Sequence, residues 1–161
     1  MLYKYMMKNK FFLLTLVLIM TLSNLSFAEI KKGQWEYVKD TDYCLIQSAP
    51  SKTDIPEGKL RGENYLLVYR MKNNIEPIIQ ITPGFNYKSS DSISVKIDDK
   101  NYSFYSDADT AWAEEDQKVI KAMKKGSKLV TSGISDKGTK VVDTYTLMGF
   151  TAAFKKLMND C

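Results

Sequence analysis

The side chains of this 161-residue sequence that could carry chemistry are mainly acidic, because the chain has no histidine and only two cysteines. Without histidine, Ser-His-Asp and Cys-His nucleophile systems and the usual zinc sites are excluded. Asp107 and Asp109 begin like a calcium-binding loop, but Trp112 stands where that loop needs glycine, and Lys118 where it needs a bidentate glutamate. We therefore interpret the acids from 107 to 116 as a helix cap and its first turns.

Three further groups of polar residues have both a functional and a structural interpretation. Asp98 and Asp99 lie between two alternating segments, which favours a solvated hairpin turn over a catalytic carboxylate pair. Asp143 shares one side of a predicted strand with apolar residues. We expect it to be structural, on a partly open face or paired with a lysine or with backbone N–H groups, rather than catalytic or ligand-binding. Four lysines could contact phosphate or lipid, although a helix C-terminus also accounts for them: Lys121, Lys124, Lys125 and Lys128.

Residues 138–161 are predicted to form a strand that runs directly into an amphipathic helix. Positions 141, 143, 145 and 147 share one side of the strand. From Phe150 the spacing becomes helical, and one stripe carries Phe150, Ala153, Phe154, Leu157, Met158 and Cys161. Gly149 is expected to allow close contact where strand becomes helix. Because the helix must bury its stripe, we expect it to cover a β-structure as a lid.

The rest of the chain is predicted to be short strands with one inserted helix. The strands are expected at 34–38, 43–49, 64–71, 76–82, 92–98, 102–105 and 128–134, with a polar loop over 51–62. The helix should begin at Asp109 or Thr110 and end at Gly126, with Val119, Ile120 and Met123 inward. Because strands do not alternate with helices, the fold class is mainly β, an antiparallel β-sandwich with a C-terminal helix packed on the sheet.

A secretory signal peptide is predicted over residues 1–28. Lys4, Lys8 and Lys10 precede a short apolar run, and a small-x-small cleavage site ends at Ala28. An uncleaved anchor is the alternative, and Met7 could equally be the start. The remaining residues, 29–161, are expected to be one domain with 20 basic and 19 acidic side chains. A net charge of +1 offers no electrostatic case for nucleic-acid binding, and no membrane span is expected after cleavage.

Both cysteines, Cys44 and Cys161, lie in the predicted mature part of the chain. An even number of cysteines in an exported protein favours a disulfide. This bridge would tie the end of the last helix to an early strand. Two independent thiols are the alternative, with Cys161 as the last apolar residue of its stripe. Ten tyrosines could form a platform for a glycan or protein, although aromatic residues on strands are more often core or cross-strand partners.

The run from Asp143 to Ala153 combines an acidic residue, a β-strand, Leu-x-Gly-Phe and a small-residue helix start. On this run the chain resembles the invasion associated locus B family, exported proteins of alphaproteobacteria. The residues that carry the resemblance or fit it elsewhere in the chain are Trp35, Cys44, Trp112, Gly126, Asp143, Tyr145, Leu147, Gly149, Phe150 and Cys161.

The resemblance implies a β-sandwich of immunoglobulin-like general shape, in the periplasm, associated with the outer membrane, or secreted. It implies no enzymatic activity and no cofactor. We therefore expect a non-enzymatic envelope protein that binds another protein or an envelope component. Two alternatives stay open: a periplasmic carrier of a small ligand or lipid beneath the C-terminal helix, and a hydrolase that uses carboxylates alone.

Overall fold

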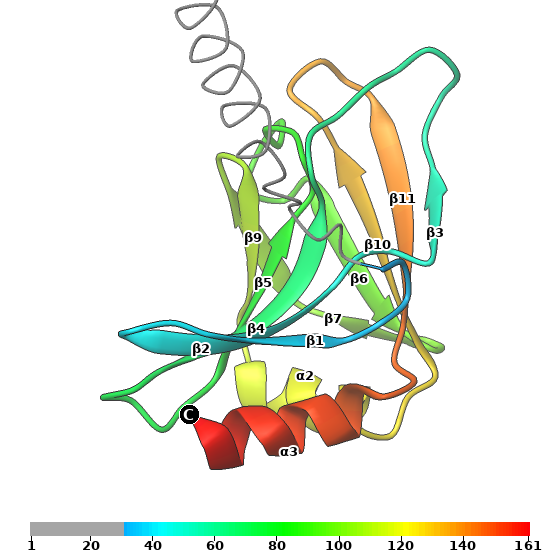
Figure 1. Ribbon diagram of the computed structural model, residues 1–161. Helices are drawn as coiled ribbons and strands as arrows, with labels where there is room; N and C mark the ends of the chain where they lie inside the picture. The colour runs from blue at the N-terminus through cyan, green and yellow to red at the C-terminus, as the bar shows by residue number, and fades with distance from the viewer. Residues whose placement is uncertain (1–30) are drawn as a thin grey trace, which may run out of the picture.

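The computed structural model describes residues 31–161, which form two antiparallel β-sheets and two helices (Figure 1). The predicted signal peptide lies outside the described residues. One sheet has six strands, in the spatial order β1 (Glu36–Lys39), β2 (Tyr43–Ser48), β4 (Tyr65–Met71), β5 (Ile78–Thr82), β9 (Thr110–Ala113) and β8 (Phe104–Asp107). The other has five, in the order β3 (Lys52–Asp54), β11 (Lys140–Thr146), β10 (Lys128–Ile134), β6 (Ile93–Ile97) and β7 (Lys100–Tyr102).

The alternation of side chains along the strands determines which residues enter the core, as predicted. β2 buries Cys44 and Ile46, whereas its intervening residues are only partly buried. β11 buries Val141, Asp143 and Tyr145 in the same manner. Since successive side chains point to opposite faces of a strand, one face of each sheet supplies the core and the other faces outward.

The two helices lie at the same end of the sandwich (Figure 1). These are α2 (Asp116–Met123) and α3 (Phe150–Asp160). Phe150, Phe154 and Leu157 of α3 are buried in a cluster with side chains from both sheets and from α2. The prediction of a mainly β sandwich with an inserted short helix and a packed C-terminal helix is therefore confirmed.

Three local predictions were wrong. Asp109 and Thr110 do not cap a helix: residues 110–113 form β9, whose Ala111 and Ala113 are buried by strand alternation, and α2 begins only at Asp116. The loop over 51–62 contains the short edge strand β3, which pairs with β11. The segment 102–105 is divided, because β7 ends in the five-stranded sheet and β8 starts in the six-stranded sheet.

Candidate functional site

The junction between β11 and α3 is packed by three of the predicted residues, Trp35, Leu147 and Phe150. The indole Nε1–H of Trp35 donates a hydrogen bond to the Thr146 carbonyl at 3.1 Å. Its ring meets Phe150 edge to face, with ring centroids 4.9 Å apart. Leu147 and Phe150 are both buried. These residues fasten the first turn of the C-terminal helix to the sandwich, which is a structural role.

Two predicted glycines differ in why they are needed. At Gly149 the backbone is left-handed, with φ +85°, and an added Cβ would lie 3.9 Å from Trp35, an ordinary contact. The predicted close contact at Gly149 is therefore wrong, and backbone conformation is the physical reason for this glycine. Close approach occurs instead at Gly126, where a Cβ would lie 2.7 Å from Ile97 and 3.1 Å from Leu147.

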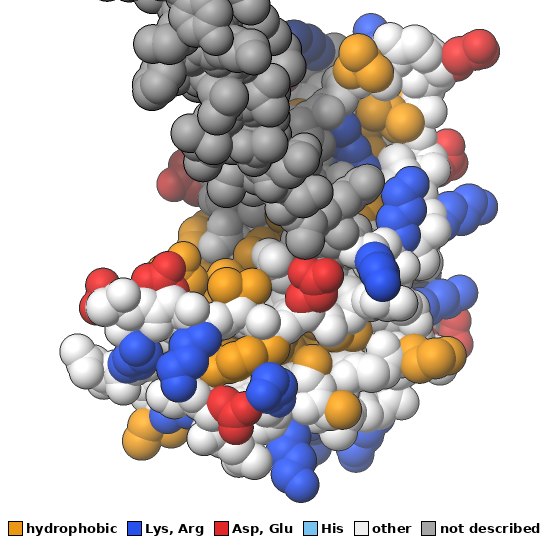
Figure 2. Space-filling view, viewed as in Figure 1, with side chains coloured by type: hydrophobic (Ala, Val, Ile, Leu, Met, Phe, Trp, Pro, Cys, Tyr) orange, Lys and Arg blue, Asp and Glu red, His pale blue; other side chains and the backbone are white. Residues whose placement is uncertain are grey.

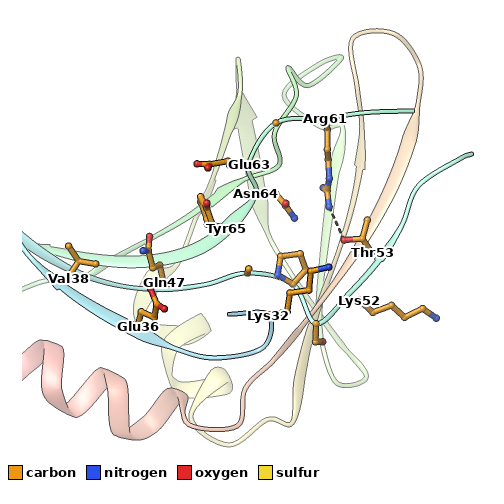
Figure 3. A pocket seen from close by; sticks show the side chains of 14 residues that line it. Lys32, Glu36, Val38, Gln47, Lys52, Thr53, Arg61, Glu63, Asn64 and Tyr65 are labelled. Carbon is orange, nitrogen blue, oxygen red and sulfur yellow. Dashed lines mark hydrogen bonds between the residues drawn. The ribbon is translucent and has the colours of Figure 1, made fainter. Parts of the chain in front are cut away.

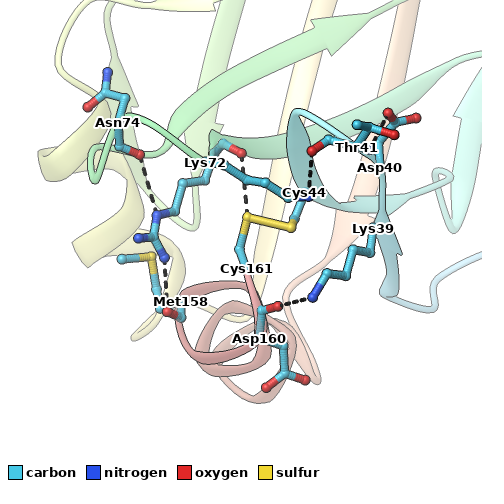
Figure 4. The surroundings of a disulfide bond; sticks show 10 residues. Lys39, Asp40, Thr41, Cys44, Lys72, Asn74, Met158, Asp160 and Cys161 are labelled. Carbon is cyan, nitrogen blue, oxygen red and sulfur yellow. Dashed lines mark hydrogen bonds between the residues drawn. A yellow bond between two sulfur atoms is a disulfide. The ribbon is translucent and has the colours of Figure 1, made fainter.

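The predicted disulfide between Cys44 and Cys161 is present and joins β2 to the end of α3, with Cα atoms 5.7 Å apart (Figure 4). Two cationic side chains also bind carbonyls of the last helical turn. Arg70 donates to Met158 at 2.9 Å, and Lys39 donates to Asp160 at 2.8 Å. Because these carbonyls have no partner within the helix, the contacts hold its C-terminus against the sheet.

Asp143 is buried in a bidentate ion pair with Arg61, a residue that the sequence analysis left unassigned. Both guanidinium nitrogens donate to the carboxylate at 2.6 Å. Thr53 donates to the same carboxylate at 2.7 Å, and Arg61 also donates to the Pro83 carbonyl at 3.0 Å. The side chains of Arg61 and Asp143 are only 9% and 3% exposed. The predicted lysine or backbone partner of Asp143 was therefore wrong, although the structural role is supported.

The rarity of arginine was the signal that could have identified Arg61. The chain has two arginines, Arg61 and Arg70, among 23 cationic side chains. Both use the guanidinium fork on partners within the fold: Arg61 on a carboxylate and Arg70 on two carbonyls. Lysine cannot reproduce this planar set of donors.

Tyr145 lies beside this ion pair, but its hydroxyl is buried and forms no hydrogen bond with any group of residues 31–161. The Asn64 amide lies near it, yet the two groups do not form a hydrogen bond of acceptable geometry. Burial, followed by the charge of Asp143, raises the pKa of Tyr145 far above its usual range, and the same two causes raise that of Tyr87. Both phenols therefore stay protonated and cannot act as bases near neutral pH.

A shallow depression of about 890 Å³ opens beside the ion pair (Figure 3). Arg61 and Thr53 form one side of it, and the rest comes from β1, β2, the first residue of β4 and the loops next to these strands. Apart from Arg61, whose charge is compensated by Asp143, its charged lining mixes two lysines, Lys32 and Lys52, with two glutamates, Glu36 and Glu63. This balance favours neither an anionic nor a cationic small ligand.

The other polar candidates occupy turns and helix ends. Asp98 lies in the β6–β7 turn, where its carboxylate accepts hydrogen bonds from the backbone N–H groups of Ser127 and Lys128. Asp107 ends β8, next to the β8–β9 turn. Lys124, near the end of α2, lies 4.0 Å from the centroid of the Phe154 ring. Within residues 31–161 no three acidic or cysteine side chains are gathered in a way that could hold a metal ion.

The outward faces of the two sheets have opposite character. On the six-stranded sheet, adjacent strands place a continuous set of apolar and aromatic residues outward, all at least partly exposed: Val38, Leu45, Leu67, Tyr69, Ile78, Tyr105 and Trp112. Figure 2 shows hydrophobic side chains over β4 and β5, with acidic side chains on both sides. On the five-stranded sheet the outward strand positions are mostly polar and include Lys52, Lys96, Lys128 and Lys140.

Trp112 belongs to this apolar outer face rather than to the core. Its ring meets Tyr69 edge to face, with centroids 6.2 Å apart, and Tyr105 is its partner across the β8–β9 ladder. Trp112 is one of the residues that fit the family resemblance, but its position on a surface was not predicted from the sequence. We call the seven residues named above, from Val38 to Trp112, the aromatic face.

Comparison with known proteins identifies the family of the chain. No curated protein and no solved structure matched it. A family model described as Invasion associated locus B (IalB) protein matches residues 36–158, from β1 to the last turn of α3. The match includes the strand–helix unit around Asp143 and Gly149 on which the resemblance depended. The chain therefore belongs to the invasion associated locus B (IalB) protein family.

Proposed function

We propose that this IalB protein is an exported, non-enzymatic envelope protein that binds another protein or an envelope component through the aromatic face. The observation that carries the proposal is the apolar and aromatic character of an outward sheet surface. Contiguous exposed apolar patches mark interaction sites in soluble proteins, and interface cores are rich in tyrosine and tryptophan and poor in charge. The opposite sheet surface has neither property.

Export to the periplasm is supported by two independent features. The Cys44–Cys161 disulfide is of a kind that persists in oxidising compartments. The first 28 residues have the pattern of a secretory signal peptide. In residues 31–161, no helix has the length and apolarity needed to cross a bilayer.

A non-enzymatic role is supported by what surrounds the acidic residues. Asp143, the most buried carboxylate among residues 31–161, accepts three hydrogen bonds from Arg61 and Thr53, so its acceptor capacity is largely used within the fold. Phe150, Phe154 and Leu157 fill the space beneath α3. For this reason we prefer surface binding to the alternative of a small-ligand or lipid carrier with a gap beneath that helix.

The proposal can be tested by comparing two matched substitutions in the tagged protein, expressed in its own cells and captured after chemical crosslinking. Leu67→Lys places a cation in the centre of the aromatic face, whereas Val142→Lys places one on the outward face of the other sheet. We expect Leu67→Lys to remove the partners that the wild type captures, and Val142→Lys to retain them. Equal retention by both variants would contradict the proposal, provided that both variants melt within a few degrees of the wild type.

A further inference from the structure

Three rings at one end of the aromatic face form a corner. Tyr69 and Trp112 stand nearly perpendicular, with an interplanar angle of 77°. Tyr105, 47% exposed, lies beside Trp112 on the neighbouring strand. The three rings come from β4, β9 and β8, so the sheet itself holds them in place. Ring faces carry partial negative charge, and they attract cations that lie over them.

An acidic side chain lies next to this corner. Asp116, the first residue of α2, accepts a hydrogen bond from the Ile79 N–H at 2.8 Å through its Oδ1 atom. Burial, followed by the charge of Asp116, raises the pKa of the Tyr69 hydroxyl, which places Asp116 close to that ring. Asp116 also lines a depression of about 470 Å³ together with Glu76 and Ile78, and Ile78 is the cross-strand partner of Tyr69.

Within residues 31–161 no basic side chain forms an ion pair with Asp116, since Lys118, which lines the same depression, pairs with Glu115. Among residues 31–161, the three ion pairs involve other acids, and no hydrogen bond to Asp116 Oδ2 is formed. Burial and, to a smaller extent, the charge of Glu76 raise the pKa of Asp116, as expected of a carboxyl group without a cationic partner. The outward strand positions of the six-stranded sheet that carry charge are also acidic, Glu36 and Asp107.

We propose that the corner formed by Tyr69, Trp112 and Tyr105 receives the guanidinium group of an arginine from a protein partner, with Asp116 as its counter-ion. The rings, with the acidic side chains of Asp116 and Glu76 beside them, are complementary to such a group. A guanidinium is planar, stacks on aromatic rings and keeps its N–H donors free for a carboxylate, so it fits rings and acid at once. This inference rests on the proposed function and adds the chemistry by which the partner is recognised.

The test uses small probes on the oxidised mature protein, followed through the indole N–H signals of its two tryptophans by NMR. N-acetyl-arginine amide should shift the Trp112 signal in a saturable manner and leave Trp35, which is packed on Phe150, unchanged. N-acetyl-citrulline amide has nearly the same shape without the charge, and it should not shift either signal. Asp116→Asn keeps an oxygen acceptor for Ile79 and removes the charge, so it should weaken arginine binding by about threefold or more. Glu36→Gln, at the other edge of the same sheet, should bind as the wild type does.

Two results would overturn the inference: equal binding of the arginine and citrulline probes, or tighter binding of choline, which would indicate a quaternary-ammonium lipid headgroup instead. Partner capture by three variants distinguishes a failure of the arginine assignment from a failure of the proposed function. If Leu67→Lys abolishes partner capture while Asp116→Asn and Trp112→Leu capture normally, the face binds a partner but the arginine assignment fails. If none of the three variants affects capture, the proposed function itself fails.

Discussion

At the scale of single residues, the interior depends on a few polar side chains whose partners are distant in sequence. Arg61 and Asp143 are 82 residues apart and nevertheless form a bidentate pair. The sequence analysis recognised that Asp143 needed a partner because a buried carboxylate is costly to desolvate. It could not identify Arg61, because the partner lies in a loop whose path over the five-stranded sheet only the tertiary structure defines.

Replacing Asp143 with Asn should destabilise the protein by about 3–5 kcal/mol, because it leaves the Arg61 guanidinium buried without its counter-charge. Chemical denaturation measures the loss. The control is the double variant Arg61→Met with Asp143→Leu, which removes both charges and should recover much of the stability. An Asp143→Asn variant as stable as the wild type would show that the pair does not stabilise the fold.

Replacing Tyr145 with Phe should leave stability at neutral pH within about 1 kcal/mol or raise it, because the buried hydroxyl has no hydrogen-bond partner in the described part of the chain. The effect should grow in alkali. The pKa of Tyr145 is raised in the folded state above the ordinary 10.0, so its protonated form contributes stability that is lost as pH rises above about 10. Unfolding followed from pH 8 to 12 should therefore show a smaller alkaline loss in the variant. A loss of more than about 1 kcal/mol at neutral pH would instead mean that the hydroxyl is hydrogen-bonded.

Substitutions at Gly149 can distinguish two reasons for a glycine at this position, its left-handed backbone conformation and close packing. Its φ of +85° should make Gly149→Leu less stable by about 1–2 kcal/mol, because side chains disfavour this region. Gly149→Asn should cost less, since asparagine tolerates left-handed backbone. Thermal melting of the two variants measures the difference. If asparagine were as damaging as leucine, crowding rather than φ would be the cause.

At the scale of elements, the periodicity of the sequence predicted most of the strands and α3. The alternation in residues 43–49 and 141–147 and the helical stripe from Phe150 each reflect burial on one side, which is a local property. The inserted helix was placed too early because Asp109 and Thr110 have the chemistry of a helix cap. That signal does not reveal that Ala111 and Trp112 pair with β5. Sheet pairing depends on distant segments and overrides local capping preference.

Removing the disulfide with Cys44→Ala and Cys161→Ala should lower stability by up to about 4–5 kcal/mol, the loop-entropy value for a bridge that spans 117 residues. Hydrogen exchange should increase first at the C-terminal turn of α3. The N-terminal turn, where Phe150 is buried against Trp35, should respond less. Exchange that increases equally along α3 would contradict this graded attachment. A variant with Ser135→Ala, at a buried position remote from the bridge, serves as the control for general destabilisation.

At the scale of the whole molecule, the contacts that stabilise the fold lie apart from the aromatic face, the surface proposed to bind a partner. Both helices, the disulfide and the Arg61–Asp143 pair stabilise the interior and its ends. The seven side chains of the aromatic face point away from the core of the described residues, whereas the outward face of the other sheet carries lysines. The sequence analysis noted the tyrosines and Trp112 but could not assign them to one surface, because strand order β4-β5-β9-β8 brings them together only in the folded sheet.

The most direct test of this account is site-specific photocrosslinking in living cells, with p-benzoylphenylalanine at position 67 or at position 142. Both positions are on central strands and point outward, so they differ mainly in which sheet they belong to. The account predicts a discrete crosslinked species from position 67 that is lost when Trp112 is replaced by Leu, and no such species from position 142. A discrete species from position 142 alone would show that the lysine-bearing sheet is the binding surface and would contradict the central claim.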